Sequence, residues 1–262
     1  MQNYSDAQDF LMKEFRFMHL PVAVKFIFKD EELQDFKKNV KDFYIPNKPL
    51  TFCQAEIGPR MKGITVLQEK NGLGCSNAAY VFGWKGFDEA EIKSHLKYVR
   101  DMKQAEKFLL SKPRLEEGKL KAIVLSPLGK TYFDPDVVHF YCDNMQAYQL
   151  SVGWMAVRDI HPMRPSVTMN SAACAGNVYA YNTKLASTHP ACSGSYNSGK
   201  TERGETNVVI PGEDIANLIS WFEERVEKYG SLSIVRPGDE FPGSDVCKNC
   251  PLIVFKKGEN AN

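Results

Sequence analysis

Four cysteines are the residues of this sequence whose type and order could do chemistry: Cys53, Cys75, Cys174 and Cys192. Soft thiolates can hold tetrahedral zinc or an iron–sulfur cluster, and the ligands can come from distant parts of the chain. These spacings are longer than the close knuckles of most structural zinc sites. The sequence therefore predicts a metal site at these positions and leaves the metal open.

The remaining cysteines divide into a local motif and a single thiol. Cys247 and Cys250 stand in the run DVCKNCP near the end of the sequence. Two sulfurs at CxxC spacing can chelate a metal, form a redox dithiol or contribute to a cluster, and an ordinary turn is the other reading. We expect a second or supplementary metal site there. Cys142 ends an apolar run and is expected to be a buried core thiol.

A thiol enzyme without metal is an alternative. Cys53 and Cys174 are each expected at a helix start, where the helix dipole lowers the pKa of a thiol and favours the thiolate. A nucleophile needs a base, for which His161 and His189 are the candidates, and the competing reading places each histidine in a solvated loop. A further alternative is a structural zinc module, in which the metal only fixes the fold.

Composition narrows the choice of partners. The 33 lysine and arginine residues nearly balance the 32 aspartate and glutamate residues, so no strong field favours nucleic acid or an anionic membrane surface. The sequence shows neither a signal peptide nor a run of about 20 apolar residues. We expect a cytoplasmic protein, where disulfides are rare and an odd count of seven cysteines points to ligation, catalysis or burial.

The elements that must position the cysteines alternate between helices and strands. This order predicts an α/β fold, with a mixed α+β arrangement as the variant, in a single domain over residues 1–262 that ends in a CxxC-bearing extension, 231–262. Apolar periodicity predicts strands over 22–28, 122–125, 137–141 and 207–210. It predicts helices over 4–18, 88–110, 145–157 and 213–229, and a further helix that follows the first strand and ends at 41.

An internal repeat is the second organising feature. Within 21–112 and within 121–230, a cysteine opens a helical stretch, and a second cysteine followed by serine precedes a strand and an acidic-capped helix. The first half uses Tyr80-Val81-Phe82 as this strand and the second half uses Val208-Val209-Ile210. A pseudo-twofold axis would bring both cysteine pairs together. Chance similarity is the alternative reading.

The order of several short motifs resembles a known family. The motifs are PVAVKF from Pro21, FDPDVV from Phe133 and CSG from Cys192, followed by VIPG from Val209. The chain resembles domain-of-unknown-function family 169 over roughly 21–229. This resemblance implies one domain, an origin among bacteria and archaea that are often anaerobic, and a group formed by the four cysteines, and it carries no activity.

These observations combine into one leading hypothesis. The chain is expected to be a metal-binding, iron–sulfur redox or electron-transfer protein, with the four cysteines as ligands and the CxxC pair as a supplementary site. Zinc is the alternative metal. A small molecule or a redox protein is the expected partner, and the sequence leaves a homo-oligomeric state open.

Overall fold

Six strands form one sheet in the order β2-β3-β1-β4-β6-β5, and all neighbouring strands are antiparallel. The computed structural model describes residues 4–159 and 171–230. Short apolar runs rich in valine and isoleucine make most of these strands, as β-branched side chains pack well on a pleated surface. The strands are β1 (Val22–Ile27), β2 (Val66–Glu69), β3 (Ala122–Pro127), β4 (Val137–Cys142), β5 (Ser187–Pro190) and β6 (Thr206–Pro211).

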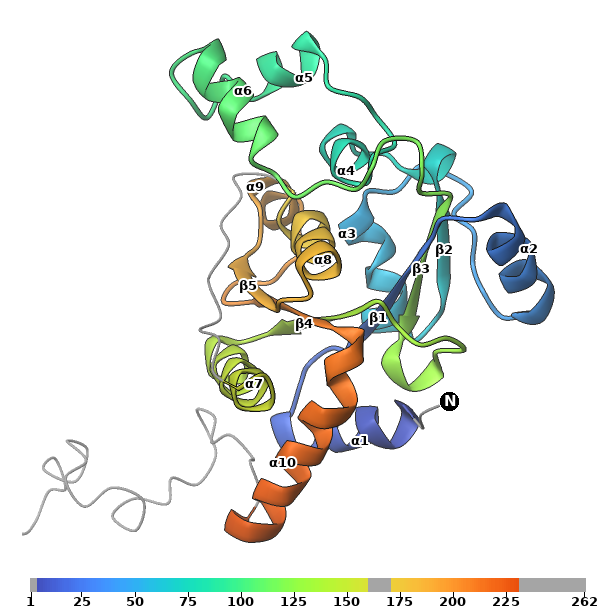
Figure 1. The fold of residues 1–262 in the computed structure, drawn as a ribbon, viewed down its shortest axis with the longest axis vertical. Helices are drawn as coiled ribbons and strands as arrows, with labels where there is room; N and C mark the ends of the chain where they lie inside the picture. The colour runs from blue at the N-terminus through green and yellow to red at the C-terminus, as the bar shows by residue number, and fades with distance from the viewer. Residues whose placement is uncertain (1–3, 160–170, 231–262) are drawn as a thin grey trace, which may run out of the picture.

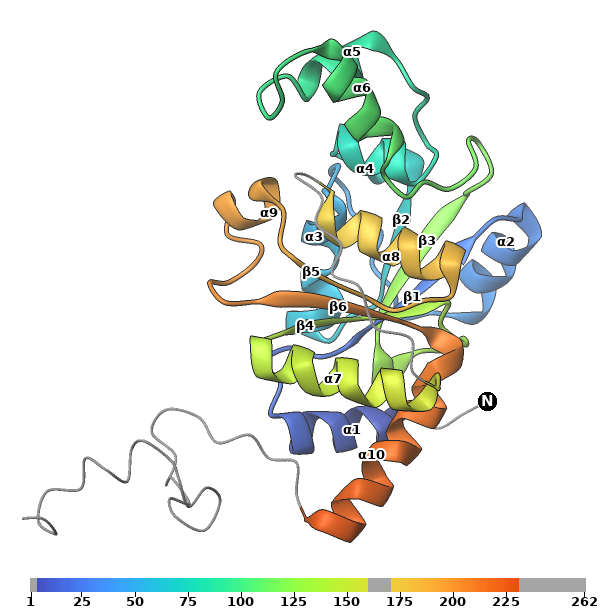
Figure 2. The same ribbon diagram turned by 60° about the vertical axis from the view of Figure 1, so that its left-hand side comes forward.

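Helices cover both faces of this sheet (Figures 1 and 2). One face carries α1 (Tyr4–Phe15), α7 (Asn144–Val157) and α10 (Ile215–Tyr229). The other carries α3 (Phe52–Ala55), α4 (Ser76–Val81) and α8 (Ala172–Thr183). The remaining helices are α2 (Asp30–Asn39), α5 (Glu89–Ser94), α6 (Met102–Leu110) and α9 (Ser193–Asn197), and shorter helical turns span Gly58–Lys62, Lys70–Gly72, Leu128–Lys130 and Gly212–Asp214.

The main core lies on both sides of the sheet. Every residue of β3 and of β4 is buried, since both faces of these strands are covered. Alternate residues of β4 point to opposite layers, so Val137 packs with the cluster around α8 whereas Val138 packs with the cluster beneath α7 and α10. His139 and Tyr141 share the face of Val137, which makes that side of β4 polar.

The two halves of the sheet repeat the same pairing. β1 pairs with β3 so that Val22 lies opposite Pro127, and β4 pairs with β6 so that Val137 lies opposite Pro211. Each pairing runs over six residues. A short helical turn follows each of the two prolines.

The edge strands follow the same rule. β2 places Val66 opposite Leu125, and β5 places Ser187 opposite Val209. Leu125 and Val209 each stand two residues before the proline that ends their strand. The strand order and the registers are therefore symmetric about the central β1–β4 pairing.

Most of the predicted elements are confirmed, and two are wrong. The helix expected over 88–110 is broken into α5 and α6, because Asp88 and Asp101 each accept a backbone N–H three residues later and start separate helices. The strand expected at Tyr80-Val81-Phe82 lies in and just after helix α4. A short buried apolar run is compatible with a helix and with a strand, so the apolar character of this run could not distinguish the two.

No helix within residues 4–159 and 171–230 combines the length and the apolar character that a membrane crossing requires.

Candidate functional site

The four predicted cysteines all lie at the starts of helices that cover the same face of the sheet. Cys75 and Cys192 are the residues that immediately precede α4 and α9. Cys53 lies in the first turn of α3, 3.3 Å from the hydroxyl of Thr51, and Cys174 lies in the first turn of α8 with Sγ 3.3 Å from a backbone carbonyl oxygen. Each thiol thus lies at or within three residues of the start of a helix.

The structure brings these four thiols into one electrostatic neighbourhood. Burial raises the pKa of the Cys174 thiol well above its usual range, and negative charge on Cys75, Cys192 and Cys53 raises it further, against the opposing effect of Lys112. Segments far apart in the sequence therefore act on one another at this point.

The expected lowering of thiol pKa at helix starts is wrong for two of these cysteines. Burial raises the pKa of Cys53, and the hydrogen bond with the Thr51 hydroxyl only partly opposes it. Burial likewise dominates at Cys174. The transfer of a charged thiolate from water to a protein interior costs more than the dipole of the helix at each of these positions returns. Without a bound cation, these two thiols are held protonated.

Within residues 4–159 and 171–230, no set of three or more His, Cys, Asp or Glu side chains is arranged to hold a metal ion as it stands. Zn–S bonds of about 2.3 Å in a tetrahedron put sulfurs about 3.8 Å apart. The metal site at the four cysteines therefore stays a prediction. Cys247, Cys250 and His161 lie outside the described residues. Cys142 is buried among apolar side chains, as expected.

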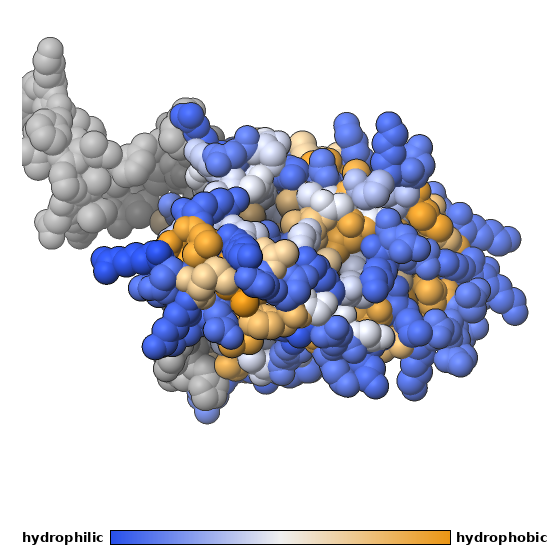
Figure 3. All heavy atoms as spheres, turned by 90° about the horizontal axis from the view of Figure 1, so that it is seen from above, coloured by the Kyte–Doolittle hydropathy of each residue, from blue (hydrophilic) through white to orange (hydrophobic). Residues whose placement is uncertain are grey.

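A helical arm, formed by α5 and α6, covers the cysteines. Ser76 directly follows Cys75 and donates to Glu91 of α5 over 2.6 Å. Ser193 directly follows Cys192, and its hydroxyl lies 3.1 Å from that of Tyr98, in the turn between α5 and α6. The arm therefore bonds to the residue after a cysteine in both halves of the chain. Seen from above, this end of the molecule carries mainly hydrophilic side chains with hydrophobic residues scattered among them (Figure 3).

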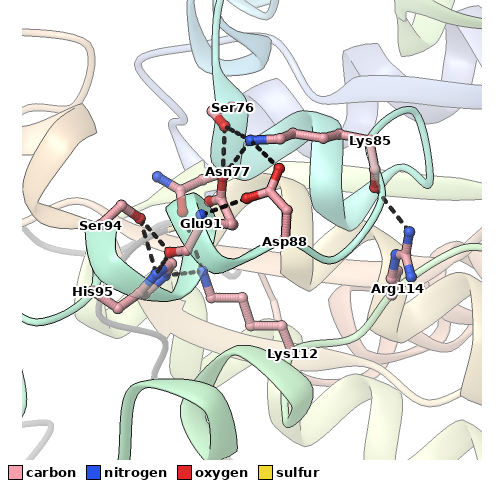
Figure 4. Close-up of polar contacts among 9 residues, drawn as sticks. All are labelled: Ser76, Asn77, Lys85, Asp88, Glu91, Ser94, His95, Lys112 and Arg114. Atoms are coloured by element: carbon pink, nitrogen blue, oxygen red, sulfur yellow. Dashed lines mark hydrogen bonds and ion pairs between the residues drawn. The ribbon is translucent and has the colours of Figure 1, made fainter. Parts of the chain in front are cut away.

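Lys112 follows the arm, and its side chain points toward His95 and Asn77 (Figure 4). Its ammonium group lies 2.8 Å from His95 Nε2, 3.3 Å from Asn77 Oδ1 and 3.5 Å from Ser171 Oγ. Burial lowers the pKa of Lys112 to about 8, although Cys174 and other negative groups favour its charged form. The sequence analysis did not identify this lysine, because a single lysine after a helix has no distinguishing pattern.

A second buried polar group lies beside Cys53 on the same face of the sheet. Glu56, in the turn that ends α3, bonds to two residues of β4. Its Oε1 lies 2.6 Å from Nδ1 of His139, and its Oε2 accepts a 2.6 Å hydrogen bond from the hydroxyl of Tyr141. Glu56 and His139 have no exposed surface. We call the set formed by Glu56, His139, Tyr141, Asn177 and Asn207 the polar wall.

Amides complete the polar wall around His139. Oδ1 of Asn207 lies 2.8 Å from Nε2 of His139, and Nδ2 of Asn177 lies 3.2 Å from Nδ1. Both ring nitrogens of His139 thus face oxygen atoms, Glu56 on one side and Asn207 on the other. Only the doubly protonated imidazolium donates at both positions. The contacts with Glu56 and Asn207 favour a buried ion pair of Glu56 and His139, whereas the donor Nδ2 of Asn177 beside Nδ1 opposes it, so the pair is a hypothesis that a stability measurement can test.

The polar wall reaches the surface through Tyr141. The guanidinium of Arg60 stacks 3.8 Å from the centre of the Tyr141 ring and bonds to Glu205 at 3.4 Å. Tyr141 and Glu205 line a hollow of about 150 Å³, together with Glu202 and other residues. A larger hollow of about 520 Å³ lies between α2 and the turn at Lys70–Gly72 and contains none of the cysteines.

His189 is not the solvated histidine or the base that the sequence suggested. It lies in β5, is buried, and its ring packs against Gly176 so closely that a Cβ there would lie 2.0 Å from Nε2. Burial lowers the pKa of His189 to about 3, and the charge of His139 lowers it further. A base with this pKa cannot take a thiol proton near neutral pH.

Only one half of the symmetric sheet carries the polar wall. Counted from the aligned pair Val22 and Val137, the position of His139 corresponds to Val24 and that of Tyr141 to Phe26. Asn207 likewise corresponds to Ile123. The first half thus keeps an apolar surface where the second half has ionisable and amide side chains.

Comparisons with known proteins locate the chain in one family. The family model that matches residues 10–220 is DUF169, described as "Uncharacterised ArCR". No curated protein and no solved structure matches the chain.

Proposed function

Since the chain belongs to the DUF169 family, whose description names no activity, we propose its function from the arrangement of its thiols. The proposal is that Cys53, Cys75, Cys174 and Cys192 hold an iron–sulfur cluster and that the protein is a redox or electron-transfer protein. The observation that carries it is that four thiols from separate helix starts act electrostatically around the buried Cys174, with Cys53, Cys75 and Cys192 themselves half-buried.

The symmetry of the sheet supports treating the four thiols as two equivalent pairs. Cys53 stands 13 residues before Val66, and Cys174 stands the same number before Ser187, which occupies the equivalent register position in the other edge strand. The second cysteine of each pair starts a short helix and is followed by serine. We propose that the chain arose by duplication and that its two halves meet at the cysteines.

Four soft thiols suit an iron–sulfur cluster, and zinc is the alternative. Charge on Cys75, Cys192 and Cys53 acts on Cys174, and no set of three or more donors among the described residues is arranged to hold a metal ion as it stands. A polynuclear cluster separates its thiolate ligands further, because iron and sulfide ions lie between them. When bound, such a cluster supplies one-electron chemistry, and burial of Cys174 excludes water from its side of the centre.

A cytoplasmic protein with this centre would exchange electrons with a redox protein or with a small molecule. Reducing conditions keep its free thiols available for iron. Cys247 and Cys250 are proposed as a second or supplementary site. A metal-free thiol enzyme has less support, because burial raises the pKa of Cys53 and Cys174 and reduces the reactive thiolate at both.

The test is anaerobic purification, followed by an ultraviolet–visible spectrum and analysis for iron, zinc and acid-labile sulfide. A brown protein with iron and sulfide that loses its colour in Cys174→Ser and keeps it in Cys142→Ser supports the proposal. Cys142 is the matched control because it is a buried thiol on the opposite layer. Colour lost only in Cys247→Ser moves the site to the CxxC motif, and a colourless protein refutes the proposal. Zinc without sulfide selects the structural module.

A further inference from the structure

The hollow of about 520 Å³ lies at the outer edge of the sheet, between α2, the edge strand β2 and the segment 45–49. Figure 1 shows α2 beside β2 at this end of the sheet. A volume of this size falls within the range of ligand-binding sites in proteins. The chemistry of its lining therefore indicates what it could bind.

One stretch of the β2 edge beside the hollow lacks a partner strand. Tyr44 bridges to Val66 in parallel, and the N–H of Leu67 donates to the carbonyl of Tyr44 over 3.0 Å. The next bond of a parallel ladder would run from the N–H of residue 46 to the carbonyl of Leu67. That position is Pro46, which has no backbone N–H. The pairing therefore stops there, and the next bridge to this edge is that of Leu50.

The backbone carbonyl of Leu67 and the backbone N–H of Glu69 face this gap as an acceptor and a donor. Alternate residues of a strand direct their backbone groups to the same edge, so Glu69 shares the direction of Leu67, away from β3. Both residues line the hollow. Over residues 4–159 and 171–230, no backbone hydrogen bond satisfies either of these two groups. An extended segment laid along β2 would satisfy both.

Charge around the hollow favours an acidic occupant. Its two carboxylates already have lysine partners, at 2.9 Å for Asp30 and at 3.1 Å for Glu69. Lys48, in the segment 45–49, and Lys70, in the turn after β2, line the same hollow. Neither forms an ion pair within the part of the chain that the structure describes. The hollow therefore has an excess of positive charge, which attracts a negatively charged partner.

We propose that this hollow binds an extended acidic peptide segment of a partner protein, which adds as a strand to the free edge of β2. A peptide backbone alternates donors and acceptors, as the two unpaired backbone groups require. An isolated carboxylate or phosphate ion offers acceptors and leaves the carbonyl without a donor. Acidic side chains of the peptide would lie near Lys48 and Lys70, and apolar ones near Leu33 and Ile45. This inference is independent of the proposed iron–sulfur function.

The test is fluorescence anisotropy of the full chain with a labelled hexapeptide of alternating glutamate and valine, at low salt so that charge is little screened. Two matched probes accompany it. One has lysine in place of each glutamate. The other is the glutamate peptide with N-methyl groups on its backbone, which removes the N–H donors that an added strand needs.

Three variants locate the peptide on the protein. Lys48→Glu combined with Lys70→Glu reverses the charge of the hollow. Gly72→Phe adds a ring to its lining, at a position where a Cβ meets no atom within 4 Å, so the fold should tolerate it. Lys103→Glu combined with Lys107→Glu is the matched control, because it makes the same change of charge on two exposed lysines of α6.

We expect the parent and the control to bind the glutamate peptide saturably. Binding should weaken by about tenfold or more in the charge-reversed variant, in Gly72→Phe and with each matched probe. Absence of saturable binding by the parent overturns the inference, as does equal binding of the lysine peptide or undiminished binding by the charge-reversed variant. Equal binding of the N-methylated peptide refutes strand addition. A parent that sediments as a dimer, and becomes a monomer on charge reversal, shows that a second copy occupies the hollow and refutes the acidic-peptide role.

Discussion

The buried pair of Glu56 and His139 provides a test of the structure that does not depend on any cofactor. The change is His139→Val, because valine occupies the equivalent position, Val24, in the other half of the sheet. It removes the imidazole ring whose Nδ1 lies 2.6 Å from Oε1 of Glu56. The carboxylate then keeps the hydroxyl of Tyr141 as its remaining bonded partner in β4.

The expected loss follows from burial. Breaking a buried ion pair by removing one partner costs about 3–5 kcal/mol of unfolding free energy, because the other charge stays in the interior. Adding Glu56→Gln removes that charge and keeps the size of the side chain. The double variant should therefore be more stable than His139→Val alone, by about 2 kcal/mol, within the range measured for coupled neighbours.

Urea unfolding at pH 7, followed by circular dichroism, measures His139→Val, Glu56→Gln, the double variant and the parent. Lys93→Ala is the control, because its ion pair with Glu89 is exposed and should contribute little. A loss below about 1 kcal/mol in His139→Val, or a double variant that loses the sum of both single losses, would show that Glu56 and His139 are not a buried ion pair.

Three further outcomes are expected. Gly176→Ala should lose about 1–3 kcal/mol in urea unfolding, because its Cβ would overlap His189, whereas Gly194→Ala, with no atom nearer than 4.0 Å, should lose nothing. The folded pKa of His189, about 3, lies below the unfolded value of about 6.5, so the unfolded chain binds the extra proton and stability falls as pH drops from 6.5 toward 3, by up to about 1.4 kcal/mol per pH unit. His189→Gln should flatten that slope in unfolding measured from pH 7 to 5, and an unchanged slope contradicts the assignment. Iodoacetamide should leave Cys142 unmodified in the native protein and modify it in urea, because burial raises the pKa of this thiol well above its usual range, as mass spectrometry of the digested protein can check.

Local patterns predicted the sheet well. The runs at β1, β3, β4 and β6 are short, mostly apolar and rich in β-branched residues, and this combination of length and composition favours a strand. The same reasoning failed at Tyr80 and Val81, where a short apolar run without alternation became helix α4. Whether this run forms a helix or a strand depends on its packing against α8, and no local sequence pattern reveals that packing.

The thiol half of the candidate site was predictable, and the polar half was not. Cysteine is a candidate ligand or nucleophile by residue type alone, and the repeated order of the four cysteines suggested that they lie close together. His139 stands in an otherwise apolar strand, where its alternation with Val138 and Phe140 marked one face as unusual, although nothing local named its partner. Glu56 lies 83 residues away along the chain and reaches His139 only through the docking of α3 on β4.

The histidine candidates show why residue type without burial misleads. His189 stands three residues before Cys192, which made it a plausible base. Its strand places it instead in a desolvated position opposite Asn207, where the neutral ring is favoured. Desolvation is a property of the assembled sheet and helix α8, so no local spacing could reveal it.

The central pairing of the sheet has a consequence for how the protein assembles. β1 and β4 pair over three residues, the shortest of the five pairings among the described strands, whereas the pairings inside each half run over six and four residues. Two cysteines come from each side of this seam. The sulfurs can therefore meet only after the halves have docked, so the proposed cluster would be inserted late in folding. Once bound, it would cross-link the two halves across the β1–β4 pairing, and its loss should separate these strands before either half unfolds.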